Sequence, residues 1–270
     1  MSIRHYRPRA RNRREFSGAR AFILLSLLFA TILLEISYPL VHGNSLRVIT
    51  LATVALGAFT MVLHSYFAFG ARFALSFFFL TFSYALSVEI IGTKTGWPFG
   101  TYHYSNSLGI TVSSVPVLVP FAWVVMSYPI LIAARRVGGS WVFLYGGLGL
   151  MSWDLFLDPQ MVSAGRWSWA TPKISTPFEP AIPLSNSAGW LFAGMGLMAL
   201  LHWALPKERR KSSANLFIPN TFLAWALFSG IVGNLFFFHR PGVALFGGAI
   251  FGALLTPFFF SLRFGRPDSF

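Results

Sequence analysis

Five of the eight carboxylates in this 270-residue chain lie in or beside long apolar segments, where acidic side chains are costly and usually functional. They are Glu35, Glu89, Asp154, Asp158 and Glu179. Asp154 and Asp158 are four residues apart, so on a helix they share one face about one turn apart. Like charges repel there and burial disfavours ionisation, so one of the two can hold a proton at neutral pH. This pair is a candidate for acid–base chemistry.

Metal, nucleophile and cofactor sites would each need residues that this sequence lacks. The two aspartates could bind Mg²⁺ with a diphosphate, but no second acidic cluster exists, and only Arg166 and Lys173 are near to support phosphate. There is no cysteine, the histidines are isolated, and nucleophile, haem, flavin and nucleotide motifs are absent. What remains is an expected site without metal or cofactor. A protonated aspartate can deliver a proton to an alkene, aromatic faces can stabilise the cation, and a second carboxylate can hold water.

Two segments that would connect helices, residues 93–115 and 158–188, are rich in Gly, Pro, Trp and Tyr. Irregular backbone with large aromatic side chains is unfavourable unless it packs over something. The first segment contains Tyr-His-Tyr at 102–104, and the second contains Trp-Ser-Trp at 167–169. A membrane-interface aromatic belt explains scattered Trp and Tyr, but explains these dense groups less well. We therefore interpret both segments as loops that cover a functional site.

Composition indicates the surroundings in which these residues work. Hydrophobic residues make up 55% of the chain and charged residues 11%, against about 25% charged residues in a typical soluble domain. A water-soluble globule of this size could not cover such a core. The composition therefore excludes a soluble enzyme, a disordered chain and a disulfide-stapled secreted domain.

Apolar runs of about 20 residues predict membrane-spanning helices. The runs do not alternate polar and apolar residues as the strands of a membrane barrel do. The expected fold is therefore all-α, a polytopic integral membrane bundle of about eight helices. The predicted spans are 21–41, 48–69, 73–92, 116–134, 141–157, 189–205, 216–238 and 243–262.

The basic residues predict the orientation of these spans. With both termini in the cytoplasm, 16 Lys and Arg residues lie inside and five lie outside, as the positive-inside rule requires. The net charge of +13 is then explained by topology, and no nucleic-acid partner is expected. Residues 1–20 are a basic cytoplasmic tail, residues 21–262 a single transmembrane domain, and residues 263–270 a short cytoplasmic tail.

A weak internal duplication links two of the predicted helices. Pro116 and Trp123 are seven residues apart where the fourth span begins, and Pro183 and Trp190 have the same spacing near the start of the sixth. Each pair follows a span that ends with an acid and then a Gly-rich aromatic loop, so the repeat would be of the parallel type.

The middle of the chain, residues 89–190, resembles the membrane carotenoid-biosynthesis family that includes the CruF-type carotenoid hydratases. No single motif is specific, but the set is. The motifs are Glu89 with Gly92 and Gly96, the run 99–104, Val115-Pro116 with Pro120 and Trp123, Asp154, Asp158-Pro159, the run 165–169, the run 182–186, and Gly189-Trp190. Ser187 stands where the family usually has an aromatic residue, and Pro180-Ala181 also departs from its pattern, which places the end-group preference in question.

The resemblance implies a cofactor-independent hydro-lyase of the carotenoid 1,2-hydratase type, in a bacterial or archaeal cell membrane. It would add water across the terminal C1–C2 double bond of an acyclic (ψ) carotenoid end and give a tertiary 1-hydroxy group. Its partners would be a hydrophobic carotenoid, water and the lipid bilayer.

The residues expected to carry this reaction fall into two groups. Asp154 is the first choice for the proton donor, and Asp158 or Glu89 would position water or tune the donor. The residues expected to bind substrate are Trp97, Tyr102, Tyr104, Trp123, Trp167, Trp169 and Asn186.

Two other functions fit parts of this pattern. A proton-coupled transporter of a lipid or small molecule would use the intramembrane acids as proton relays. The predicted acids gather at one face of the membrane instead of its midplane, which disfavours this reading. A membrane prenyltransferase would need Mg²⁺ and a diphosphate substrate.

Overall fold

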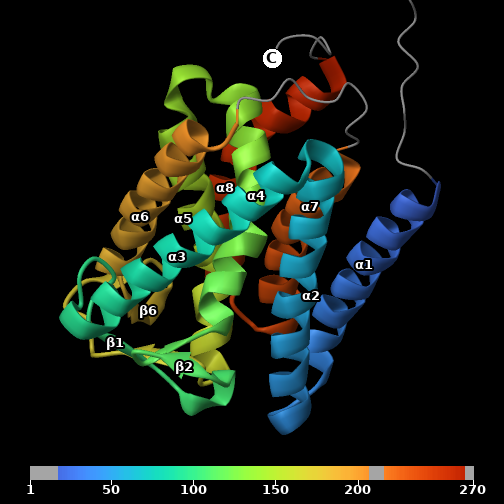
Figure 1. Cartoon of the computed structure of the whole chain (residues 1–270). Helices are drawn as coiled ribbons and strands as arrows, with labels where there is room; N and C mark the ends of the chain where they lie inside the picture. Colours follow the sequence, from blue (N-terminus) through green and yellow to red (C-terminus); the bar gives the residue numbers. More distant parts are fainter. Residues whose placement is uncertain (1–17, 207–215, 265–270) are drawn as a thin grey trace, which may run out of the picture.

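The computed structural model describes residues 18–206 and 216–264. Over these ranges the chain forms an all-α bundle, as predicted (Figure 1). Its helices are α1 (Gly18–Ser37), α2 (Gly43–Phe69), α3 (Ala71–Thr95), α4 (Leu118–Val137), α5 (Val142–Ser163), α6 (Leu184–Ala204), α7 (Phe217–Val232) and α8 (Pro241–Phe264).

Seven of the helices in the described ranges are long and apolar enough to cross a membrane, which confirms a multi-pass membrane protein. The helix outside that set is α5, because Asp154, Asp158 and Gln160 lie close together in it and lower its apolar character. The two basic tails and the basic residues at 207–211 lie mainly outside the described residues, so the cytoplasmic placement of the termini stays a prediction.

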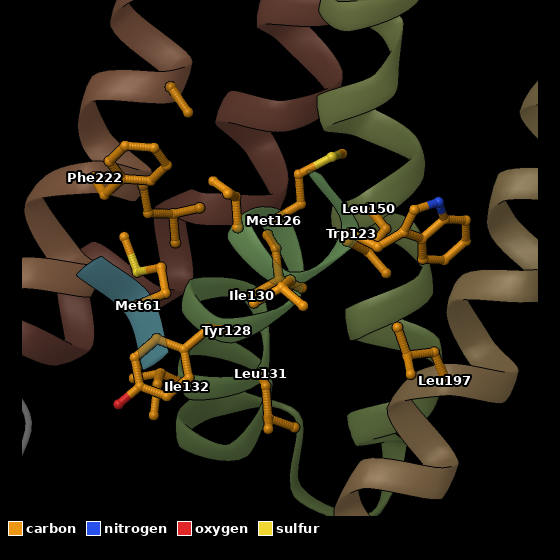
Figure 2. Close-up of a cluster of buried hydrophobic side chains, with 14 of the residues drawn as sticks. Met61, Trp123, Met126, Tyr128, Ile130, Leu131, Ile132, Leu150, Leu197 and Phe222 are labelled. Atoms are coloured by element: carbon orange, nitrogen blue, oxygen red, sulfur yellow. The ribbon is translucent and has the colours of Figure 1, made fainter. Parts of the chain in front are cut away.

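Helix α4 forms the centre of the bundle. Of the 18 consecutive residues that make up its apolar stretch, 72% are buried, and the helix contacts α2, α3, α5, α6, α7 and α8. Figure 2 shows the core that results, in which large side chains from five helices meet. They are Trp123, Met126, Tyr128, Ile130, Leu131 and Ile132 of α4, with Met61 of α2, Leu150 of α5, Leu197 of α6 and Phe222 of α7.

Helices α5 and α6 pack closely because glycines face each other between them. A Cβ atom on Gly147 would lie 2.8 Å from the backbone oxygen of Leu191, and one on Gly194 would lie 3.0 Å from the Cα of Gly147. Contacts this short require the helices to separate. The glycines therefore fix the distance between the two helices that carry Asp154, Asp158 and Asn186.

Replacing Gly147 by Ala should lower the free energy of unfolding by about 1–3 kcal/mol, because the added methyl group meets backbone that cannot move alone. Gly252 of α8 is the matched control, since a Cβ atom there meets nothing within 4 Å. Thermal unfolding of the purified protein in detergent measures both variants. Equal melting temperatures for the two would contradict this account of the α5–α6 contact.

The loops that cover one end of the bundle pair with each other through short strands (Figure 1). Strand β1 (Tyr102–Tyr104) of the first loop is antiparallel to β4 (Trp167–Trp169) of the second. Strand β2 (Thr111–Val112) pairs with β3 (Val115–Pro116), and β5 (Ser175–Thr176) pairs with β6 (Glu179–Pro183). Two segments that lie far apart in sequence thus form one cover.

The helix ends differ from the predicted spans at α5 and α6. Helix α5 continues to Ser163, although the predicted span ended at residue 157, so Asp158 lies inside the helix. Pro159 does not end the helix. Helix α6 begins at Leu184, five residues before the predicted span, so that Asn186 lies in its first turn.

Candidate active site

The paired strands cover a cavity of about 80 Å³, here named the aromatic cavity. Side chains alternate along a strand, so Tyr102 and Tyr104 point to one side while His103 points to the other. The register places Tyr102 opposite Trp169, with ring centroids 5.9 Å apart, and Tyr104 opposite Trp167, with centroids 5.7 Å apart. All four rings line the cavity. The spacing of two residues between the tyrosines and between the tryptophans therefore produces an aromatic wall.

Glu89 of α3 lies in this cavity and is 4% exposed. The hydroxyl groups of Tyr102 and Tyr104 donate to its Oε2 over 2.5 and 2.7 Å, and the indole N–H of Trp123 donates to its Oε1 over 3.1 Å. These three neutral donors satisfy both oxygens of the buried carboxyl group and offset part of the cost of burying it. Burial first, and then the charge of Glu89, raise the pKa of both tyrosines, so their hydroxyl groups keep their protons.

Asp154 and Asp158 are both buried, and both accept a hydrogen bond from the side-chain amide of Asn186. The distance from the amide nitrogen to Oδ2 of Asp154 is 3.1 Å. Trp167 adds a donor to Oδ1 of Asp158 at 3.1 Å, which ties the aromatic cover to α5. Oδ1 of Asp154 has no hydrogen-bond partner among the described residues.

The two aspartates differ in the spaces that they reach. Asp158 and Asn186 line the aromatic cavity, whereas Asp154 does not. A smaller cavity of about 10 Å³ is lined by both aspartates and by Asn186, together with Thr176 and Glu179. Of the two carboxyl groups, the one with access to a molecule in the aromatic cavity is therefore that of Asp158.

Glu179 and Glu35 lie apart from the aromatic cavity. Glu179 forms an ion pair with Arg240 at 2.9 Å, and burial raises the pKa of Glu179 while Arg240 opposes that rise. Glu35 accepts a hydrogen bond from the indole of Trp225 and lines a third cavity of about 500 Å³, here named the large cavity. The five acids therefore belong to more than one site.

Eight of the ten residues expected to act in catalysis or binding line the aromatic cavity, namely Glu89, Tyr102, Tyr104, Trp123, Asp158, Trp167, Trp169 and Asn186. Asp154 stands behind Asp158, as described above. Trp97 is 68% exposed and does not line the cavity, because it follows the end of α3 and lies outside the paired strands.

Sequence reasoning left out Trp190, which stacks on Trp123 with ring centroids 4.4 Å apart and an interplanar angle of 15°. Trp190 also lines the aromatic cavity. The signal was present in the repeated spacing of Pro116 with Trp123 and Pro183 with Trp190. The two equivalent tryptophans of that repeat meet face to face.

All the residues of the aromatic cavity fall within the part of the chain that matches a known family. Residues 49–255, more than half of the chain, match the family model described as carotenoid biosynthesis protein. The chain belongs to this carotenoid biosynthesis protein family. The resemblance carried by the motifs at 89–190 is thereby confirmed.

This carotenoid biosynthesis protein is also similar to a protein named bisanhydrobacterioruberin hydratase from Haloarcula japonica. The two are 30% identical over 163 residues, which cover 57% of this chain and 54% of that protein. The chain therefore aligns with about half the length of that relative. No solved structure matches the chain.

Proposed function

We propose that this carotenoid biosynthesis protein is a hydratase that adds water across the terminal C1–C2 double bond of an acyclic carotenoid end. The name of the haloarchaeal relative supports hydration as the reaction class. The observation that carries the proposal is that the carboxyl groups of Glu89 and Asp158 line the same aromatic cavity in unlike surroundings. Glu89 is held by three neutral donors, whereas Asp158 shares an amide with a second carboxyl group.

Asp158 is the proton donor in this proposal. Two buried carboxyl groups on one amide cannot both ionise without strong repulsion, so the pair retains one proton. Asp158 gives that proton to C2 of the substrate, because its side chain faces the aromatic cavity. Asp154 is then the partner that keeps the shared proton available and receives part of the charge.

Proton transfer to C2 leaves a tertiary cation at C1, which the aromatic walls stabilise. The faces of Trp and Tyr rings attract positive charge, by about 2 kcal/mol or more when the site is dry. Trp167, Trp169 and the stacked pair Trp123–Trp190 surround the position where that cation forms. The carboxylate of Glu89 on the same wall adds an opposite charge.

Water captures the cation at C1, and Glu89 takes the proton that the water loses. The hydroxyl groups of Tyr102 and Tyr104 donate to Glu89, and their oxygens can accept a hydrogen bond from this water at the same time. The proton on Glu89 returns to the aspartate pair before the next turnover. The net change is one water added, so the reaction needs no cofactor.

The size of the cavities fits an isoprenoid end with its chain extending away. The aromatic cavity has room for a short end group, and it shares Thr50, Val54, Ala122, Leu157 and Met161 with the large cavity. The polyene would therefore run from the large cavity into the aromatic cavity. Within residues 18–206 and 216–264, no Lys or Arg lines the aromatic cavity, which disfavours a diphosphate substrate for prenyl transfer.

Expression in bacterial cells that accumulate lycopene tests the proposed function. We expect a new pigment whose mass exceeds that of lycopene by one water, with an unchanged polyene absorption spectrum. The proposed cell membrane location is checked in the same cells by fractionation. A pigment heavier by one oxygen atom, or uptake without chemical change, would overturn the proposal.

The two tryptophans Trp167 and Trp97 should differ sharply when each is replaced by Phe. Loss of the indole N–H of Trp167 removes a donor to Asp158, and about 1–1.5 kcal/mol of lost hydrogen bonding corresponds to roughly a tenfold lower rate. Trp97 is exposed, so its variant should retain its rate within about twofold. Pigment hydration rates in isolated membranes measure both. Equal decreases in rate for the two variants would contradict the assignment of Trp167 to the active site.

A further inference from the structure

The large cavity combines an apolar wall with a few buried polar groups. Most of the residues around it are aliphatic or aromatic, but Glu35, Tyr38, Thr53 and Gln160 also line it. The hydroxyl groups of Tyr38 and Thr53 are buried and have no hydrogen-bond partner in the described part of the chain. A buried hydroxyl group without a partner is unfavourable, so the two helical segments that supply these groups retain them at a cost to stability.

Glu35 adds an acceptor to these hydroxyl groups. The indole N–H of Trp225 donates to its Oε2, and no other side chain among the described residues donates to this carboxyl group. Glu35 lies on α1, Thr53 on α2 and Trp225 on α7, so side chains from three helices meet at this cavity. Glu35 and Tyr38 both precede residue 49 and lie outside the region that matches the family.

We propose that Glu35, Tyr38 and Thr53 form a hydroxyl-binding subsite in the large cavity, which accepts an isoprenoid chain that already carries an alcohol group. The inference rests on the proposed function for the identity of the chain as an isoprenoid. An alcohol donates one hydrogen bond and can accept others, and the same cavity offers a carboxyl acceptor and two hydroxyl donors. A hydrocarbon would leave these groups unpartnered, and a free cation would be costly to bury in this apolar wall.

The subsite lies in a cavity that adjoins the one in which the alkene end of the substrate would react. The large cavity shares part of its wall with the aromatic cavity, so one ligand can occupy both. An alcohol bound at Glu35 would hold the neighbouring chain while its alkene end reaches Asp158. The protein would therefore prefer a carotenoid end that bears a hydroxyl group to one that does not.

Equilibrium binding of radiolabelled farnesol, an isoprenoid alcohol, to the purified protein tests the subsite without turnover. Unlabelled farnesol should displace the label at a concentration about tenfold lower than farnesene, the corresponding hydrocarbon, as expected for one or two hydrogen bonds. In the double variant Tyr38→Phe, Thr53→Val, that ratio should fall below about twofold. The affinity for farnesene should stay unchanged, which shows that the cavity is intact.

Thr60→Val is the matched control. Thr60 lies on the same helix as Thr53, but its hydroxyl group donates to the backbone oxygen of Leu56 and does not line the large cavity. This variant should keep the wild-type ratio. The subsite is overturned if the double variant keeps the ratio, if it loses farnesol and farnesene equally, or if neither ligand binds to the wild type. Because binding needs no catalysis, the expected ratio for the wild type does not depend on whether the proposed hydration occurs.

Discussion

Replacing Asp158 by Asn should lower the hydration rate at least about 1000-fold, because Asn has nearly the same shape but cannot give a proton to carbon. The amide oxygen of Asn can still accept from either Trp167 or Asn186, which donate to different oxygens of Asp158, so one of these two contacts is kept. Turnover of a saturating carotenoid substrate in isolated membranes, normalised to the amount of protein, gives the rate. Thermal unfolding in detergent confirms that the variant is folded.

The equivalent change at Asp154 distinguishes the two aspartates. Asp154 does not line the aromatic cavity, so Asp154→Asn should reduce the rate less, by about 10- to 100-fold, through loss of the shared proton. Sequence reasoning favoured Asp154 as the donor. If Asp154→Asn were inactive and Asp158→Asn retained its rate, the donor role would belong to Asp154 after all.

Replacing Glu89 by Gln should reduce the rate about 100- to 1000-fold and also change its pH dependence. In the wild type the rate should fall at low pH as Glu89 takes up a proton, and fall at high pH as the aspartate pair loses its proton. Glu89→Gln has no base to protonate, so the fall at low pH should disappear and the fall at high pH should remain. Rates measured across the pH range show whether that limb is lost.

A cavity-forming variant gives a second measurement of the same role. Glu89→Ala leaves space beside Tyr102, Tyr104 and Trp123, and added formate can enter and act as the missing carboxylate. We expect formate to restore part of the rate in Glu89→Ala and to leave Asp158→Asn unchanged. A Glu89→Gln rate within about threefold of wild type would show that Glu89 only holds the tyrosines in place.

The aromatic part of the site was predictable because its pattern is local. Tyr-His-Tyr and Trp-Ser-Trp each place two Tyr or two Trp residues on either side of one polar residue, and a strand turns the two outer side chains to the same face. The pairing of the two strands was not predictable from either loop alone. It depends on contact between segments more than 60 residues apart, as between Tyr102 and Trp169.

The sequence could not predict which of the two aspartates lines the aromatic cavity, and the reason is geometric. Residues four apart on a helix differ in direction by only about 40°. The surrounding elements decide which one meets the aromatic cavity: Asn186 of α6 donates to both aspartates, whereas Trp167 of β4 donates to Asp158. Apolar length predicted the helices themselves well, but it placed the end of α5 before Asp158, because Pro159 resembles a helix stop.

Glu35 illustrates a different limit. Its position near the outer end of the first apolar run predicted that it lies on the same face of the membrane as the other four acids. The structure places it in the large cavity beside Trp225, a residue 190 positions away that sequence reasoning did not consider. A contact of this kind depends on how α1 packs against α7, and no local pattern specifies that packing.

Incubation of membranes that contain the protein with lycopene in ¹⁸O-labelled water, without oxygen, tests the central claim most directly. Acid-catalysed hydration predicts a hydroxylated product that carries the heavy oxygen from water, and no such product from Asp158→Asn membranes. A product that forms only when oxygen or a reductant is added, or one that lacks the heavy isotope, would contradict the proposed chemistry of Asp158 and Glu89.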